Sequence, residues 1–276
     1  MRCISTQSAW QSRRGFLLAA GAAAATPALA QVDVGKRSGF RKMVSADEIE
    51  QAAAQQYAKM MAEARAQRAL ASDDNAQLRR LRAVAQRIIP HAAQWNERAT
   101  QWRWEVSLIG SKEINAFCMP GGKIAFYTGI LDRLGLTDDE TAMIMGHEMA
   151  HALREHARER IGKTQATGVG LSLFSQLLGL GDLGNAVANI GTQLLTLTFS
   201  REDESEADLV GLELAARAGY LPQAGASLWR KMAEASSGSG NLAFLSTHPS
   251  GPQRIRDLQA NEPKVQGLYE RARKSG

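Results

Sequence analysis

A five-residue pattern inside one predicted helix constrains this chain more than any other feature. The helix opens with the capping box Thr137–Glu140 and is predicted to run to about Ile161. Within it stand His147, Glu148 and His151, the pattern H-E-x-x-H. Because residues four apart share a helix face, both imidazoles can hold one metal ion while Glu148 polarises a water beside it. The alternative is an amphipathic helix whose histidines are exposed or make ordinary hydrogen bonds.

A second helix, predicted for residues 201–218, supplies acidic candidates for a third ligand. On a helical wheel with about 100° per residue, Glu204 and Asp208 lie about 40° apart among small apolar residues. Buried carboxylates need partners, and a metal ion with a ligand imidazole would satisfy both. Gly211 and Ala207 are small enough for this helix to approach its neighbour closely. The other acids fall on the opposite face, which we expect to meet solvent: Glu202, Glu206 and Glu213.

These two patterns resemble the H-E-x-x-H and E-x-x-x-D signatures of the HtpX-like and CAAX-prenyl-protease zinc metallopeptidases, peptidase family M48. The resemblance covers roughly residues 75–260, and the motifs follow the family's order. It implies a zincin-like fold of the gluzincin type, in a soluble and exported member without a pair of membrane spans. The further stretches that resemble the family are Asn115–Phe117, Pro120–Gly122, Thr128–Leu131, Ser200–Arg201, Thr247–Pro249 and Arg254.

The resemblance also implies a role for each residue of the two signatures. His147, His151 and Glu204 would be the ligands of one zinc ion per chain, which leaves an open position for water, as a catalytic zinc requires. Glu148 would be the general base. Asp208 would orient a ligand histidine or assist proton transfer.

Two residues near the end of the chain are further candidates. His248, on a loop before a proline, is expected either to bind the metal as a fourth, inhibitory ligand or to stabilise the oxyanion of an intermediate. A histidine that only holds its loop by hydrogen bonds is the alternative. Arg254 is expected to pair with a buried acid such as Asp208. His156 lies about 140° around the predicted helix from His151, so it is expected to face away from the metal.

The rest of the pattern indicates an α+β protein, mostly helical with a small sheet. We expect a metallopeptidase domain at 75–262, an N-terminal helical segment at 31–74 before it and a tail at 263–276 after it. The predicted strands lie near 104–108, 114–117 and 123–128. The other predicted helices cover 46–71, a segment capped by Asp73 or Asp74 that contains 78–88, 222–235 and 253–260, with a flexible link at 236–240.

One predicted strand is a candidate for substrate binding. Gly122, Lys123, Ile124 and Ala125 follow a Pro-Gly turn and can pair with the backbone of an extended polypeptide. Such pairing selects unfolded chains rather than a particular sequence. We therefore expect this strand to be the substrate edge of the sheet.

The first thirty residues have the pattern of an export signal. Ser12–Leu18, with Arg13 and Arg14, precedes an uncharged Ala-rich stretch, and Ala28–Ala30 is a small-residue cleavage site. The pattern resembles a twin-arginine signal, which carries folded proteins. We expect cleavage after Ala30 and a periplasmic protein. An ordinary secretion signal with a chance arginine pair is the alternative.

Charge and hydropathy limit the partners of the chain. It carries 33 basic and 28 acidic residues, and three of the arginines lie in the first thirty. The remainder has 30 basic and 28 acidic residues and no run of five like charges, which argues against nucleic-acid binding. Residues 164–181 carry no charge and are expected to form an apolar lid that touches a membrane surface at most peripherally. Cys118, the only cysteine after the signal, is expected to be a small buried hydrophobe.

Together these features predict an exported zinc-dependent endopeptidase. Its partners would be polypeptide substrates, and the resemblance implies quality control of misfolded or unassembled envelope proteins. The alternative is a non-catalytic, zinc-containing binding or chaperone-like envelope protein. Glu148 argues against that alternative, because a structural zinc site has no use for a general base.

Overall fold

The structure is a computed structural model that describes residues 32–166, 194, 197–239, 243–249 and 251–275. The predicted signal and most of the uncharged segment 164–181 lie outside the described residues, as does Gly240. The helices are α2 (Ala46–Ala66), α3 (Ala76–Ile88), α4 (Thr128–Leu134), α5 (Asp138–Arg154), α6 (His156–Ala166), α9 (Arg201–Arg217), α10 (Ala224–Ser239), α11 (Ala243–Thr247) and α12 (Pro252–Ser275). Three 3-10 turns cover Gly39–Met43, Ile89–Gln94 and Glu97–Thr100.

Side-chain caps begin the two helices that matter most for the site. The Thr137 hydroxyl accepts a hydrogen bond from the Glu140 N–H, and the Glu140 carboxylate accepts one from the Thr137 N–H. Ser200 and Asp203 form the same reciprocal pair at the start of α9. These caps satisfy the first free N–H groups of each helix, so the start of each is fixed by sequence.

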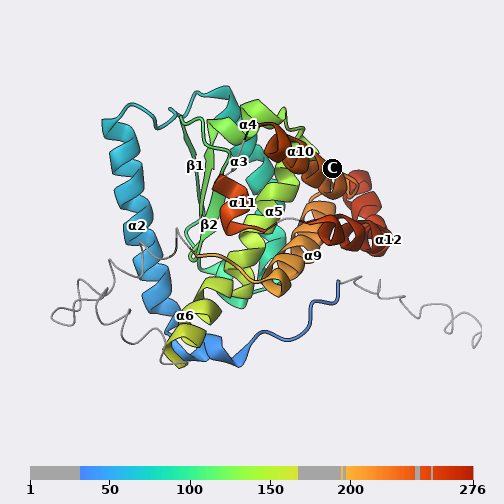
Figure 1. The fold of residues 1–276 in the computed structure, drawn as a ribbon, viewed down its shortest axis with the longest axis horizontal. Helices are drawn as coiled ribbons and strands as arrows, with labels where there is room; N and C mark the ends of the chain where they lie inside the picture. Colours follow the sequence, from blue (N-terminus) through green and yellow to red (C-terminus); the bar gives the residue numbers. More distant parts are fainter. Residues whose placement is uncertain (1–31, 167–193, 195–196, 240–242, 250, 276) are drawn as a thin grey trace, which may run out of the picture. The chain divides into compact units, whose positions relative to one another are not determined.

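The sheet contains β1 (Glu105–Ile109), β2 (Ala116–Met119) and β3 (Lys123–Tyr127). Its order is β1-β3-β2, with β1 parallel and β2 antiparallel to β3. The β2–β3 turn contains Gly121 and Gly122, both with positive φ, a conformation that favours glycine. Figure 1 shows α2 on one side of this sheet and α3 and α5 on the other. The mostly helical α+β class expected from the sequence is confirmed.

The prediction that residues 122–125 form a substrate edge is wrong. β3 is the central strand, since β1 pairs with one side of it and β2 with the other. The Lys123 ammonium is also engaged, 2.6 Å from the Glu105 carboxylate. The sequence predicts the hairpin of β2 and β3. The pairing of β1 with the other side of β3 depends on tertiary packing, which the local sequence does not report. The edge strands are β1 and β2; among the described residues β1 forms one further bridge, between Ile109 and Leu70, and no other strand pairs with β2.

Helices α5 and α9 make backbone contact at two glycines. A Cβ added to Gly146 would lie 2.8 Å from the Gly211 carbonyl oxygen, and a Cβ on Gly211 would lie 2.6 Å from the His147 nitrogen. Real Cβ atoms essentially never come so close. The close approach expected for Gly211 therefore occurs, and it fixes the distance between the two helices.

Several predicted boundaries are wrong. The helix expected to reach Ile161 breaks at Glu155, whose φ of 65° is left-handed, so α5 and α6 are separate. The link expected at 236–240 is helical as far as Ser239, and the last helix continues past 260 to Ser275. Tertiary packing extends these helices beyond their local signals, since α12 packs on α9, and α10 packs on α5 and α12.

Of the three acids expected on the solvent face of α9, only one is exposed. Glu202 is exposed, but Glu213 is buried and its carboxylate accepts hydrogen bonds from Arg217 and the Val32 N–H. Glu206 is half-buried and pairs with Arg154. The reason is that α9 is covered on several sides, by α5, by α12 and by the N-terminal segment around Val32.

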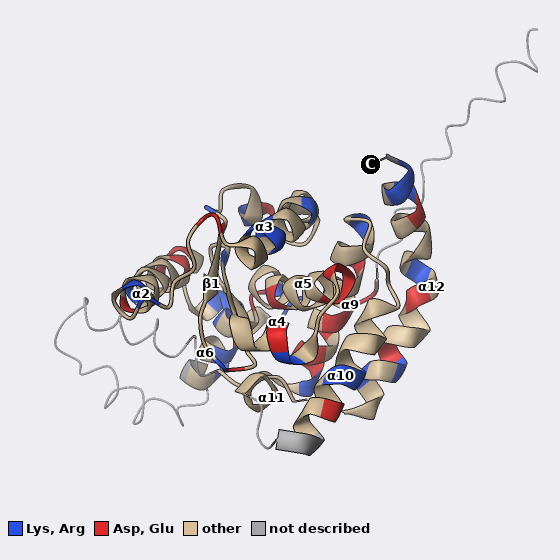
Figure 2. Cartoon of the chain, turned by 90° about the horizontal axis from the view of Figure 1, so that it is seen from above, with Lys and Arg blue, Asp and Glu red and all other residues tan. Residues whose placement is uncertain are grey.

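Figure 2 shows the acidic residues of α9 between α5 and α12, while Lys and Arg are spread over several helices, α3, α6, α10 and α12 among them. Among the described residues, no helix is both long and apolar enough to cross a membrane.

Candidate metal centre

Helix α5 places the H-E-x-x-H residues at the centre of the protein. His147, Glu148 and His151 are each at most 4% exposed. The two imidazoles point to one spot, with their Nε2 atoms 3.1 Å apart. The alternative of exposed histidines on an amphipathic helix is therefore wrong, and Leu153 and Ala150 on the same helix are fully buried in the core.

Two residues from outside α5 complete the cluster. Glu204, on α9, has its carboxylate oxygens 3.5 Å from His147 Nε2 and 3.4 Å from His151 Nε2. His248 follows α11 and has Nδ1 3.3 Å from His147 Nε2 and 3.0 Å from the Glu204 carboxylate. One ligand atom from each of these four buried residues lies within 4.8 Å of all the others.

The donor set fits a zinc ion. Zinc binds imidazole nitrogen at about 2.0–2.1 Å in a tetrahedral arrangement, which puts neighbouring donor atoms about 3.3 Å apart. The observed separations of 3.0–3.5 Å match that arrangement. Three ring nitrogens and a carboxylate that face one point also suit a cation, because each can direct a lone pair at it. The zinc expected from the sequence is supported by this chemistry.

Asp208 and Arg254 stand behind His147. The Asp208 carboxylate lies 3.1 Å from His147 Nδ1 and accepts hydrogen bonds of 2.6 and 2.7 Å from Arg254. Arg254 also lies 2.6 Å from the Glu204 carboxylate and stacks on the Trp229 ring at 3.7 Å. Burial acts to raise the pKa of Asp208, but Arg254 and His147 outweigh it, so that pKa lies below its usual range. Asp208 is therefore a carboxylate at neutral pH.

Glu148 differs from the other acids of the site. Its Oε1 is buried and has no hydrogen-bond partner among the described residues. Burial raises the pKa of this carboxyl, and the positive groups of His248 and His147 only partly offset the rise. By contrast, burial of Glu204 is outweighed by its close contacts with His151 and His248, and its pKa is lowered. Glu204 is thus held as an anion, while Glu148 takes up a proton more readily than an ordinary glutamate.

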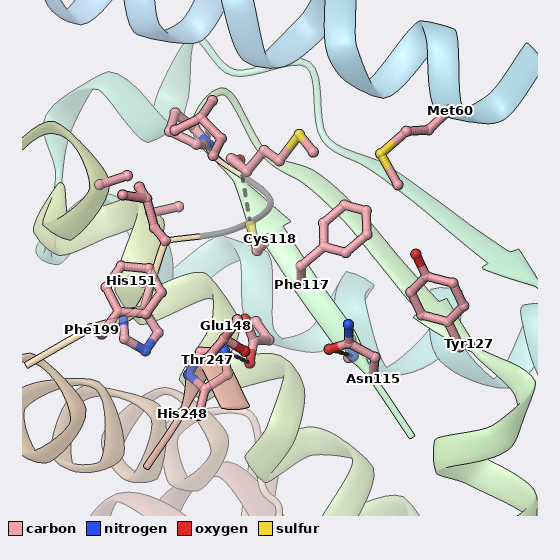
Figure 3. A pocket seen from close by; sticks show the side chains of 17 residues that line it. Met60, Asn115, Phe117, Cys118, Tyr127, Glu148, His151, Phe199, Thr247 and His248 are labelled. Atoms are coloured by element: carbon pink, nitrogen blue, oxygen red, sulfur yellow. Dashed lines mark hydrogen bonds and ion pairs between the residues drawn. The ribbon is translucent and has the colours of Figure 1, made fainter. Parts of the chain in front are cut away.

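A pocket opens beside Glu148, between β2 and the segment before α9 (Figure 3). Its walls are mostly apolar, and Phe117, Tyr127 and Met60 lie across from Glu148, His151 and His248 in the close-up view. Cys118 faces the same pocket but is buried, which raises the pKa of its thiol. It lies in the apolar wall, in keeping with the expected buried hydrophobe.

The structure brings together seven of the predicted site residues: His147, Glu148, His151, Glu204, Asp208, His248 and Arg254. The predicted strand residues 122–125 do not line the pocket in the part of the chain that the structure describes.

Sequence reasoning missed Trp229 and wrongly excluded His156. His156 is 1% exposed, and its Nδ1 lies 2.9 Å from Nδ1 of His151. The wheel assumed one continuous helix, whereas the break at Glu155 turns His156 back toward His151. Nothing in the local sequence marks Glu155 as left-handed, since only glycine and asparagine are common there. Trp229 lies on α10, and no motif links it to the metal helices.

Comparison with known proteins agrees with this geometry. The model of peptidase family M48 matches residues 75–262. The mitochondrial metalloendopeptidase OMA1 of Schizosaccharomyces pombe is 39% identical over 166 residues, which are 59% of this chain and 48% of that protein. The metalloprotease LoiP of Escherichia coli is 29% identical over 54% of this chain and 59% of that protein. The beta-barrel assembly-enhancing protease of E. coli is 27% identical over 65% of this chain and 37% of that protein.

The buried donor set on an H-E-x-x-H helix defines a candidate zinc centre of the metallopeptidase type. Because the family model covers well over half of its length, the chain belongs to peptidase family M48. The chain spans half or less of the length of the first mitochondrial relatives that it matches.

Proposed function

We propose that this protein is a zinc-dependent endopeptidase in which His147, His151 and Glu204 hold the metal and Glu148 is the general base. The observation that carries the proposal is the free, buried Oε1 of Glu148 beside the four-donor cluster and the open pocket. Bound zinc would polarise the scissile carbonyl and make water a better nucleophile. Glu148 would take the proton of the attacking water and pass it to the leaving amine.

Asp208 is proposed to orient His147. The Asp208 carboxylate would accept a hydrogen bond from the Nδ1–H of His147, which leaves the Nε2 lone pair directed at the metal position. Arg254 neutralises Asp208 and also faces Glu204, so one guanidinium holds the two acids of α9 in place.

His248 is proposed to occupy the fourth ligand position at rest. Its Nδ1 belongs to the donor cluster, and its Nε2 lies 3.6 Å from Glu148 Oε1. A ring in this position competes with the water that Glu148 would activate. Movement of the loop that carries His248 would open the site.

The substrate is proposed to lie along β2. Asn115 accepts a hydrogen bond from Tyr127 on β3, so in an antiparallel ladder the backbone of Ala116 and Cys118 points away from β3. The Ala116 N–H is bonded to the Asn115 side chain. The remaining groups lie at an edge that no other described strand covers, on the wall of the pocket that contains Glu148. An extended polypeptide could add there as a further strand, with side chains selected by the apolar wall.

Export and a role in envelope quality control are proposed from the sequence. The resemblance of Ser12–Leu18 to a twin-arginine signal and the cleavage pattern ending at Ala30 support export to the periplasm. One E. coli relative is named for enhancing β-barrel assembly, which agrees with work on unassembled envelope proteins. Replacing Arg13 and Arg14 by lysine keeps the charge; accumulation of uncleaved precursor inside the cell would support the route, and normal export would exclude it.

Glu148→Gln tests the enzymatic proposal against the non-catalytic alternative. Digestion of casein by the purified protein should fall by about 10²–10⁴-fold, with one zinc per chain retained. Glu202→Gln, a change at an exposed acid of α9, serves as the control and should keep full activity. Activity of Glu148→Gln near the wild-type level would refute the mechanism. A wild-type protein that binds zinc, cleaves nothing and suppresses aggregation of an unfolded protein would favour the chaperone-like alternative.

A further inference from the structure

We propose that His156 is a positioning residue for the metal ligand His151, at the centre of a relay formed by Arg154, Glu206 and His156. The inference rests on the proposed metal site and adds to it the side chains that fix His151. It assigns a function to a histidine that the sequence pattern places on the wrong face of its helix.

The relay is a continuous chain of polar contacts. His156 Nδ1 lies 2.9 Å from His151 Nδ1, and His156 Nε2 lies 3.3 Å from the Glu206 carboxylate. The same Glu206 oxygen accepts a 2.8 Å hydrogen bond from Arg154 Nε. His151, His156 and Arg154 are buried, and only Glu206 reaches solvent, with 28% of its side chain exposed. The chain of contacts thus runs from the metal position to the surface.

Only one arrangement of protons satisfies all of these contacts with neutral rings. His151 Nε2 faces the donor cluster, so its lone pair must be free for the metal, and the proton sits on Nδ1. That N–H donates to His156 Nδ1, which must then be the acceptor. The proton of His156 consequently sits on Nε2 and is donated to Glu206. The relay therefore selects the tautomer of His151 that can bind a metal.

The contact between His156 and His151 depends on the break between α5 and α6. Glu155 takes the left-handed conformation, and its carboxylate pairs with Arg37, Arg41 and Arg158 at 3.4, 2.9 and 2.5 Å. On a continuous helix His156 would point about 140° away from His151. The break turns the ring back, so the three arginines around Glu155 hold the geometry on which the relay depends.

The two ligand histidines of α5 are supported in parallel ways. His147 Nδ1 meets Asp208, which Arg254 neutralises; His151 Nδ1 meets His156, whose acid Glu206 is neutralised by Arg154. The two arrangements differ because the imidazole of His156 lies between His151 and its acid, whereas Asp208 contacts His147 directly. Phe199 stacks on His151 at 3.9 Å and offers no acceptor. Without His156, the Nδ1–H of His151 would be buried with no partner in the described structure.

The test is the zinc dissociation constant of the purified full chain, measured by competition with a chelator. His156→Phe keeps a ring of similar size but removes the acceptor, and it should weaken zinc binding by about 10–100-fold, the usual effect of losing such a partner. His156→Asn is the conservative variant, because its Oδ1 takes the place of Nδ1. It should recover most of the affinity. The matched control is His91→Phe, a change at a half-buried histidine of the 3-10 turn 89–94, which should bind zinc like the wild type.

The outcomes separate the inference from the proposed function. If the wild type binds no zinc, the metal site itself is wrong. If it binds zinc and the Phe variant loses less than about fivefold, or if the Asn variant is as weak as the Phe variant, the relay has no positioning role. If the Phe variant does not fold, Glu206→Ala replaces it, since that change removes the acceptor of the His156 proton. Unchanged zinc affinity in Glu206→Ala would then refute the inference.

Discussion

Gly211→Ala is the sharpest test of how the two metal helices are joined. The added Cβ would lie 2.6 Å from the His147 nitrogen and 2.9 Å from the Gly146 carbonyl carbon. Ordinary contact begins near 3.4 Å. The helices must therefore separate by several tenths of an ångström, and the opposing atoms are backbone and cannot rotate away. Overpacking of this kind costs about 3 kcal/mol, the upper part of its usual range.

Part of that cost is offset, because alanine favours a helix over glycine by up to about 1 kcal/mol. The net loss of about 2 kcal/mol corresponds to a melting temperature lower by about 4–8 °C for a chain of this size. The same displacement moves Glu204 on α9 away from His147 and His151. Since zinc–ligand distances tolerate only about 0.2 Å, zinc affinity should fall together with stability.

The assay is thermal unfolding with and without a chelator, together with zinc competition. Gly225→Ala is the matched control: it lies on α10, and its added Cβ would meet Leu258 at an ordinary 3.4 Å. That variant should melt at or slightly above the wild-type temperature and bind zinc equally well. If Gly211→Ala melts like the wild type and keeps its zinc affinity, the backbone contact does not set the geometry of the site.

Two further predictions concern His248 and Glu140. His248→Ala should raise basal proteolysis with zinc retained, because it frees the fourth position; a loss of about 10²–10³-fold would instead assign it to the transition state, and unchanged activity would leave it a structural role. Burial acts to raise the pKa of Glu140, but Lys231, Thr137 and Ser227 outweigh it and lower it below 4.5. Its stabilising effect is therefore present above pH 4.5 and lost as the pH falls through the lowered value. Glu140→Gln, measured in the presence of a chelator, should melt about 2–4 °C below the wild type at pH 7, and the gap should close in acid. A gap that persists at low pH would contradict this assignment.

Helical periodicity made the part of the donor set that lies on α5 and α9 predictable, whereas His248 lies on a loop outside any such pattern. His147 and His151 share a face by spacing alone, and the wheel separates Glu204 and Asp208 from Glu202. The capping boxes at Thr137 and Ser200 likewise fix the helix starts through local hydrogen bonds. These features depend on neighbours within one turn, and sequence reports such neighbours well.

Features that depend on packing between distant segments could not be predicted. The pairing of β1 with β3 places the Lys123 strand in the middle of the sheet, with β1 and β2 at its two edges. The burial of Glu213 requires Val32, which lies far away in the sequence. The turn at Glu155 is stabilised by arginines from another segment, so the position of His156 is a tertiary result rather than a local one.

The elements that carry the proposed metal ligands are distinct from those that form the far wall of the proposed substrate pocket. Glu204 and the two histidines of α5 are locked by the glycine contact, whereas Met60 on α2, Phe117 on β2 and Tyr127 on β3 form the opposite wall. Substitutions in that wall can alter which side chains are accepted without passing through the metal helices. Cleavage preference can therefore diverge within this family while the chemical apparatus stays constant. For engineering, residues of this far wall are therefore the ones to substitute, and the contact between Gly146 and Gly211 is the one to keep unchanged.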